Sequence, residues 1–302
     1  MNKGIYFASF TALLWGFLAI ALKVSLYDLP PLSVTWFRFA IAFVSLFLFY
    51  LLFDRPKLRI IANPPLLALV AATCLGLNYI GFITGIHLTT PSIGQVFIQT
   101  GPVLLAISGI VIFKEKLSIR QAFGFLIVVA GLLIFYREKI IILAGGMQSY
   151  KTGVMWVLFG ALSWVTYAIF QKKAVLRHNP LQLNLVLFGL PALFLFPFVE
   201  FNLVPSLDLS DWLMLVFLGL NTLGAYGSLA YALKHLEANK ISVIITLNPI
   251  ITFVVMAILS KKQVSWIEPE LFSVITVVGA VMVLSGAVLT VVRKKRGYPN
   301  KK

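Results

Sequence analysis

Residues 12–23 read ALLWGFLAIALK, and residues 161–172 read ALSWVTYAIFQK. Six of the twelve positions are identical, including Trp15 and Trp164, and the offset between the two stretches is 149 residues. One such match can arise by chance in an apolar chain, so the deciding question is whether later segments repeat at a similar offset. They do, in the same order: Gly101-Pro102 with Asn248-Pro249 at 147, Lys114-Glu115-Lys116-Leu117-Ser118 with Lys261-Lys262-Gln263-Val264-Ser265 at 147, and Gly124 and Gly131 with Gly279 and Gly286 at 155. This order predicts an internal duplication.

The composition predicts an all-α integral membrane protein. Of the 302 residues, 60% are hydrophobic and only 12% are charged, which is too few charges to cover a soluble globule of this size. Apolar runs close to the roughly 20 residues that cross a bilayer as a helix number ten, at 4–23, 32–53, 65–86, 92–113, 119–136, 152–171, 181–199, 211–233, 241–260 and 271–292. We expect five helices in each of two repeats, residues 1–143 and residues 144–302, the second ending in a basic tail.

The placement of lysine and arginine predicts the orientation in the membrane. With a cytoplasmic N-terminus, 18 of these residues fall in cytoplasmic segments and five in outer loops, while Lys23 and Arg38 lie near the outer ends of their helices. The positive-inside rule therefore places both termini in the cytoplasm, with the protein in the inner or plasma membrane. The net charge of +15 fits this topology beside anionic lipid at the cytoplasmic face, and nucleic acid is not an expected partner.

An odd number of helices in each repeat has a topological consequence. After five crossings the second repeat begins on the opposite side of the membrane, so the two repeats insert upside down relative to each other. Inverted repeats suit alternating access around a site near the middle of the membrane. The sequence thus predicts ten transmembrane helices, arranged as two inverted five-helix repeats around a central cavity, in a transporter of small molecules.

The landmarks resemble the drug/metabolite transporter superfamily, specifically its ten-helix EamA-type members with two EamA repeats. The residues that carry the resemblance are Trp15-Gly16, Arg38-Phe39, Pro102 followed by the segment 114–118, and the pair Gly124 and Gly131. The second half departs from this pattern, because Val165 follows Trp164 and the segment 261–263 has no acid equivalent to Glu115. The resemblance covers essentially the whole chain and implies transport of a small organic molecule.

Two matching polar stripes predict where substrate binds. Ser92, Gln95, Gln99 and Pro102 fall on one helical face, and at an offset of 147 their equivalents are Asn239, Ser242, Thr246 and Pro249. Polar side chains that face lipid are costly, so we expect both stripes to face each other, a cavity or the protein interior. Hydrogen bonding between helices is the alternative, and for the small Ser242 and Thr246 it is as strong as cavity lining.

Further polar and aromatic residues lie within the apolar runs. The sequence LGLN occurs at 75–78 and at 218–221, so Asn78, Tyr79 and Asn221 are candidates for the cavity wall. Trp15 and Trp164 stand near the middle of their runs, away from the interfacial belt where Trp is usual, and Tyr167 lies one turn from Trp164. These rings either form a wall for an apolar or aromatic substrate or serve packing alone.

Four residues are expected to act in gating or in structure. Pro102 and Pro249 remove a backbone donor deep in their helices, which predicts a kink that serves as a hinge, as a broken-helix site or as a fixed bend. Arg38 is the one strong charge within a helix, and we expect a structural or gating role for it in preference to carboxylate binding. Glu115 is expected to pair locally with Lys116 or Arg120.

All ten acidic residues fall in loops or at helix ends, so no carboxylate is expected at mid-membrane. A proton pump that relies on a buried acid lacks its relay, and cationic drugs lack a counter-charge. No phosphate-binding glycine loop is present, and no ATP site, cofactor or metal is expected. We therefore expect secondary transport of a neutral or zwitterionic metabolite, such as an amino acid, by export, exchange or facilitated diffusion. The alternatives are a flippase for a lipid-linked substrate and a membrane-embedded enzyme, which needs clustered carboxylates or histidines.

Overall fold

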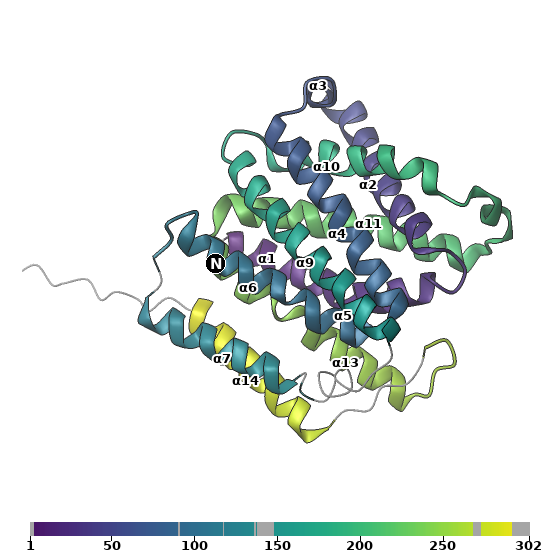
Figure 1. The fold of residues 1–302 in the computed structure, drawn as a ribbon. Coiled ribbons are helices and arrows are strands. Elements are labelled where there is room, and N and C mark those ends of the chain that lie inside the picture. The colour runs from purple at the N-terminus through teal and green to yellow at the C-terminus, as the bar shows by residue number, and fades with distance from the viewer. Residues whose placement is uncertain are drawn as a thin grey trace, which may run out of the picture.

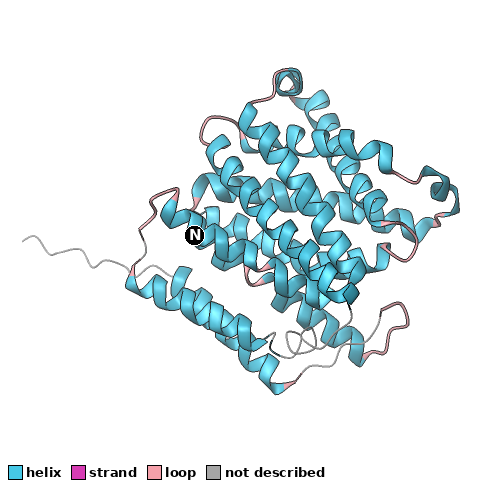
Figure 2. Ribbon diagram, viewed as in Figure 1, coloured by secondary structure: helices cyan, strands magenta, loops and turns pink. Residues whose placement is uncertain are grey.

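Helices and short connections make up the fold, because a backbone within hydrocarbon has to satisfy its own hydrogen bonds. The computed structural model describes residues 3–89, 91–116, 118–135, 137, 148–267 and 273–291, and these contain no β-strand (Figure 2). The first half comprises α1 (Lys3–Ser25), α2 (Pro31–Phe53), η1 (Arg55–Leu58), α3 (Arg59–Ala62), α4 (Leu66–Leu88), α5 (Pro91–Ile98), α6 (Thr100–Val111) and α7 (Ile119–Phe135). The second half comprises α9 (Gln148–Ala174), α10 (Pro180–Leu195), η2 (Phe196–Phe198), η3 (Phe201–Ser206), α11 (Leu209–His235), α12 (Ala238–Ile245), α13 (Asn248–Lys261) and α14 (Val274–Val291).

Eight segments of the described chain are long and apolar enough to cross a membrane. They are α1, α2, α4, α5 with α6, α9, α10 with η2, α11, and α12 with α13, whereas α7 and α14 are shorter apolar helices. The ten apolar runs read from the sequence fall on these segments and on the two shorter helices. The repeat boundary at 143/144, the acids Glu138, Glu268 and Glu270, and the basic tail lie outside the described residues.

Helix ends follow the local signals of the sequence. Pro31 and Pro180 stand in the first turns of α2 and α10, where proline loses no helical hydrogen bond. At the start of α11, Asp208 and Asp211 form a reciprocal capping box, each side chain accepting from the other residue's backbone N–H at 2.9 Å. These signals set where each helix starts and therefore which residues reach the centre of the bundle.

The helices of the two halves pack in exchanged pairs. α1 and α4 are the first and third long helices of the first half, and α9 and α11 are the first and third long helices of the second half. The third helix of each half lies along the first helix of the other, α4 along α9 and α11 along α1 (Figure 1). Likewise α2 contacts α11, α10 contacts α4, and α2 and α10 contact each other. The contacts thus repeat the duplication that the sequence stretches 12–23 and 161–172 indicate.

α7 and α14 lie side by side at the edge of the bundle (Figure 1). A Cβ atom added to Gly286 would lie 2.6 Å from the carbonyl oxygen of Gly124, and one added to Gly131 would lie 2.9 Å from Cβ of Met282. Only glycine permits this close approach of the two backbones. The glycine faces of the two repeats, Gly124 with Gly131 and Gly279 with Gly286, therefore pack against each other within one chain.

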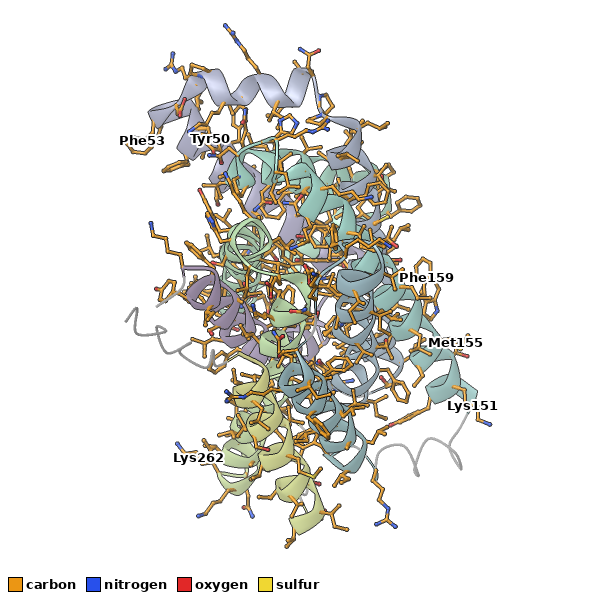
Figure 3. The ribbon with its side chains drawn as sticks, turned by 90° about the vertical axis from the view of Figure 1, so that its left-hand side faces the viewer. Tyr50, Phe53, Lys151, Met155, Phe159 and Lys262 are labelled. Carbon is orange, nitrogen blue, oxygen red and sulfur yellow. The ribbon has the colours of Figure 1, made fainter. Side chains whose placement is uncertain are left out.

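Apolar side chains cover the flank of the bundle between its ends. Met155 and Phe159 on α9 point outward in Figure 3 and are 66% and 41% exposed. Lys151 and Lys262 stand at one end of the molecule, and α3 stands at the other (Figure 3). A belt of exposed apolar residues between two polar ends is what contact with lipid requires. We call the end that carries α3 the α3 end and the opposite end, which carries η3, the η3 end.

Candidate functional site

Two interrupted helices meet at their breaks. α5 ends at Ile98 before Gln99, and α12 ends at Ile245 before Thr246 and Leu247. Pro102 and Pro249 each follow the last residue of the preceding helix by four positions, so each proline ring excludes that residue's carbonyl from a helical hydrogen bond. The side-chain amide of Gln99 donates to Oδ1 of Asn248 at 2.9 Å and joins the two breaks. The kinks expected from the sequence are therefore short breaks in the helices, at Gln99 and at Thr246 and Leu247, where the backbone keeps helical φ and ψ.

A cavity with room of about 60 Å³ for the centre of a water-sized probe lies against these breaks. Both halves contribute to its walls, through α1, α2, α4, α5 and α6 on one side and α9, α11, α12 and α13 on the other. The residues that line it are Trp15, Leu18, Arg38, Asn78, Tyr79, Phe82, Gln95, Ile98, Gln99, Pro102, Trp164, Tyr226, Ile245 and Asn248.

The structure brings most of the residues singled out in the sequence to this cavity. They are Trp15, Arg38, Asn78, Tyr79, Gln95, Gln99, Pro102 and Trp164. Ile98 and Ile245, which sequence reasoning missed, carry a usable signal, because each precedes its proline by four positions. Leu18 and Phe82 are apolar residues in apolar helices, and nothing in the sequence distinguishes them from lipid-facing neighbours.

The remaining predicted binding residues do not line the cavity. Ser242 Oγ donates to the carbonyl of Ala238 at 2.8 Å, and Thr246 Oγ1 donates to the carbonyl of Val243 at 2.6 Å, so both hydroxyls bond within their own segment. Tyr167 lies behind Tyr226, with ring centroids 5.6 Å apart. Pro249 also stands outside the lining.

Two asparagines make equivalent bonds between the halves. Asn78 Nδ2 on α4 donates to the carbonyl of Gly160 on α9, and Asn221 Nδ2 on α11 donates to the carbonyl of Leu14 on α1, both at 2.9 Å. The repeated LGLN sequence therefore has a structural counterpart in the two exchanged helix pairs. Of the two, Asn78 lines the cavity and Asn221 does not.

Aromatic rings from both halves form one wall. The rings of Trp15 and Trp164 meet edge to face, with centroids 5.9 Å apart and an interplanar angle of 74°. Tyr226 lies 5.3 Å from Trp15 and 5.7 Å from Tyr79, measured between ring centroids. Trp164 Nε1 is buried and has no hydrogen-bond partner among the described residues.

Arg38 is 2% exposed and reaches the cavity instead of extending to the membrane surface. Its Nε donates to Oγ1 of Thr222 at 3.3 Å, and its Cζ lies 4.2 Å from the centroid of the Tyr79 ring. The Tyr79 hydroxyl also donates to Thr222 Oγ1, at 3.3 Å, while Thr222 itself donates to the carbonyl of Leu218 at 2.9 Å. Thr222, which sequence reasoning missed, thus fixes Arg38 and Tyr79 together, and no pattern in the sequence marks it.

Glu115 links the two halves at the α3 end. Its carboxylate accepts from the backbone N–H groups of Ala238 at 2.7 Å and Asn239 at 3.1 Å, in the first turn of α12, and lies 3.4 Å from Lys172 Nζ at the end of α9. The expected local pairing with Lys116 or Arg120 is wrong. Lys114 adopts a positive φ of 54°, which turns the chain after α6 and directs Glu115 to a helix N-terminus that favours a carboxylate. We call Glu115, Lys172, Ala238 and Asn239 the Glu115 clasp.

Comparison with known proteins identifies the family. Residues 2–137 and residues 151–292 each match the EamA-like transporter family. The chain belongs to this family. It is therefore a multi-pass membrane transporter, which accounts for the apolar flank and the duplicated helices, and it is not an enzyme.

Relatives of this EamA-like transporter align along nearly its whole length. It is 34% identical to an uncharacterized transporter of Haemophilus influenzae over 97% of this chain and 95% of that protein. It is 31% identical to YhbE, an uncharacterized inner membrane transporter of Escherichia coli K12, over 96% of this chain and 91% of that protein. A probable amino-acid metabolite efflux pump of Salmonella typhimurium is 23% identical over 96% of this chain and 95% of that protein. A solved crystal structure, 18% identical, shares the fold with a TM-score of 0.73 over 96% of this chain and 98% of that chain.

Proposed function

We propose that this EamA-like transporter moves a small neutral or zwitterionic metabolite, such as an amino acid, by non-ATP-driven alternating access, in the direction of export or as an exchanger. The observation that carries the proposal is the cavity that both halves share, set against two broken helices that one hydrogen bond joins. The name of the Salmonella relative, an amino-acid metabolite efflux pump, supports the choice of amino acids and of export.

The proposal includes ten crossings in two inverted repeats. α7 has 17 residues and α14 has 18, and a rise of 1.5 Å per residue makes each about 26 Å long, which is at the lower limit for helices that cross a bilayer. With five crossings per repeat the halves are inverted, and the exchanged helix pairs support a two-fold relation between them. The excess of lysine and arginine supports an orientation with the α3 end and both termini in the cytoplasm.

Alternating access assigns roles to the breaks and to the clasp. The interruptions at Gln99 and Thr246 let the two parts of each broken helix move separately, as hinges do. The Glu115 clasp holds the first half against the start of α12, so opening the cytoplasmic side requires its carboxylate to leave the α12 N-terminus and Lys172. Substrate leaves at the η3 end when that end opens.

Flux in proteoliposomes tests this proposal. Vesicles that contain the purified protein are loaded with isotopically labelled amino acids, and mass spectrometry follows exchange with unlabelled compounds outside. We expect time-dependent exchange without chemical change, reduced at least tenfold by Gln99→Ala, since this substitution removes the bond to Asn248. Gln182→Ala is the matched control, because this amide bonds to the carbonyl of Lys57 at the α3 end, away from the cavity. A chemically altered product, or movement of a lipid-linked compound alone, overturns the proposal.

A further inference from the structure

Arg38 brings a charge to the cavity wall that the protein does not balance. No carboxylate among the described residues lines the cavity or forms an ion pair with Arg38. Its Nε has an acceptor in Thr222, but no described residue supplies a hydrogen-bond acceptor to its two terminal nitrogens. A buried cation without a counter-charge is costly, and the usual ways to relieve that cost are an ion pair or a bound anion.

We propose that Arg38 binds the carboxylate of the transported molecule, so that the substrate class is small monocarboxylates, and in particular α-amino acids with apolar or aromatic side chains. This inference rests on the proposed function and narrows its substrate. It reverses the expectation from the sequence, in which Arg38 had a structural or gating role.

The neighbours of Arg38 prepare it for this task. Tyr79 supports the flat guanidinium at 4.2 Å, and Thr222 holds Nε at 3.3 Å, so the plane and direction of the group are set before a ligand arrives. The two terminal nitrogens remain for a carboxylate, which matches the guanidinium fork with two parallel hydrogen bonds. A group fixed in this way loses little side-chain entropy on binding.

The rest of the cavity suits the other parts of an amino acid. Gln95 Oε1 and Gln99 Oε1 are buried acceptors without partners among the described residues, and an ammonium group supplies donors to such oxygens. The aromatic wall that includes Trp15 and Trp164 offers contact for an apolar side chain. Arg38 is the one cation in the described lining, so a dicarboxylate would leave one of its charges unpaired.

The first experiment compares matched ligands on the unaltered protein. Purified protein is titrated with the common amino acids, their α-amides, and the corresponding amines and deaminated acids. Binding is followed by thermal shift and by intrinsic tryptophan fluorescence, to which Trp15 and Trp164 contribute together with four other tryptophans. We expect at least one amino acid to bind roughly tenfold to a hundredfold more tightly than its amide, because the amide lacks the charge-assisted pair with Arg38. Because this comparison needs no variant, it does not depend on whether Arg38 can be replaced.

The second experiment replaces Arg38. Arg38→Gln should abolish the preference for acid over amide, and Arg38→Lys should keep part of it, since the charge remains but the fork is lost. Arg55→Gln is the matched control, because Arg55 is exposed in η1 and its Nε bonds only to the carbonyl of Leu51. Gel filtration and an unchanged unfolding temperature without ligand verify that each variant is folded.

The outcomes separate this inference from the proposed function. Equal binding of acids and amides, an unchanged preference in folded Arg38→Gln, or no binding by any carboxylate in the panel overturns the carboxylate site. If the flux assay still shows transport of other solutes, the proposed function stands without it. Tight, Arg38-dependent binding of amino acids with no flux in proteoliposomes supports the carboxylate site and overturns transport of amino acids.

Discussion

The two ends of this transporter share a backbone arrangement but differ in charge. At the α3 end, Lys172 Nζ donates to the carbonyl of Leu236, just after α11, at 2.9 Å. At the η3 end its equivalent Lys23 donates to the carbonyl of Thr89, just after α4, at 3.5 Å. The chain turns beside these lysines also match, because Lys114 and Gln263 both adopt positive φ, at 54° and 48°. α13 has 14 residues and α6 has 12, so these turns correspond at an offset of 149 instead of the 147 of the aligned sequences. The position after each turn is then Glu115 at one end and Val264 at the other.

A second difference lies in the helix that receives the carboxylate. Ala238 donates its backbone N–H to Glu115, but at an offset of 147 its equivalent is Pro91, which has no N–H. The η3 end thus lacks the acid and one of its two donors. The duplication kept the geometry of both ends, whereas electrostatic closure is present at the α3 end. We expect the closed state of the α3 end to be the more stable of the two.

The largest effect should come from removing the acid of the clasp. Glu115→Gln weakens two backbone hydrogen bonds and leaves Lys172, whose side chain is only 13% exposed, without its counter-charge. We expect a loss of about 2 kcal/mol for closure of the α3 end. In a Cys74→Ser background, a cysteine at cavity residue 98 (Ile98→Cys) should then react at least tenfold faster with an impermeant maleimide added from the α3 side.

Glu237→Gln is the control for this prediction. Glu237 lies directly before α12 as well, but it is 45% exposed and pairs with Lys240 three residues away. Its loss removes the same charge from the same end and breaks none of the hydrogen bonds of the clasp, and its effect on the charge of Lys172 is smaller than that of Glu115. Equal acceleration of labelling in Glu237→Gln and Glu115→Gln would show that general charge, not the clasp, closes this end.

An acid placed at the η3 end should strengthen closure there by a smaller amount. Val264→Glu puts a carboxylate at the position equivalent to Glu115, near the end of α1, where Val264 packs against the cluster of Ile20, Met256 and Ile267. We expect the closed state of the η3 end to be stabilised by about 0.5–1 kcal/mol, since Val264 is half-buried and the carboxylate gains Lys23 as partner. Labelling of the cysteine at position 98 from the η3 side should slow about threefold. The control is Val264→Gln, because glutamine has the shape of glutamate but no charge. The same slowing of labelling in that variant would contradict an ion pair.

Restoring the backbone N–H that is missing at Pro91 should stabilise closure of the η3 end further in the Val264→Glu variant. In Val264→Glu, the further change Pro91→Ala supplies a backbone N–H at the start of α5, as Ala238 does for α12. The new bond is offset in part by the loss of the fixed proline backbone, so we expect a net gain of about 0.5 kcal/mol. Pro91→Ala alone has no acid to meet and should not slow labelling from the η3 side. If Pro91→Ala slowed labelling equally with and without Val264→Glu, this would contradict the proposed correspondence between the two ends.

The sequence was sufficient for the helices because their signals are local. Apolar runs set their positions, and prolines such as Pro31 and Pro180 set where they begin. The prolines of the broken helices were visible too, since a proline four positions after a residue always excludes that carbonyl. These features depend on chain geometry within a few residues, and no tertiary contact changes them.

The sequence predicted the site only in part, because polar residues at equivalent positions of the two halves make different contacts in the folded protein. Gln95 and Gln99 reach the cavity, whereas Ser242 and Thr246, at equivalent positions, turn their hydroxyls onto carbonyls of their own helix. The partner of Glu115 depends on the positive φ of Lys114 and on how α12 packs against α6. Periodicity assigns a residue to a face, but side-chain length and tertiary packing decide what it binds.

The smallest expected effect concerns the acids of the η3 end. Slight desolvation of the exposed Asp28 side chain, together with the charges of Asp211 and Asp208, raises its pKa above the ordinary value of 3.8. Because the folded-state pKa is the higher one, ionised Asp28 opposes folding above that pKa, and stability is gained as pH falls toward 3.8. Asp28→Asn should therefore raise the unfolding temperature slightly at neutral pH, by a few tenths of a kcal/mol after solvent screening, and leave it unchanged below pH 3.8. Thermal unfolding of both proteins across this window checks the sign, and a variant that is less stable at neutral pH would mean that ionised Asp28 stabilises the η3 end as Glu115 does the α3 end.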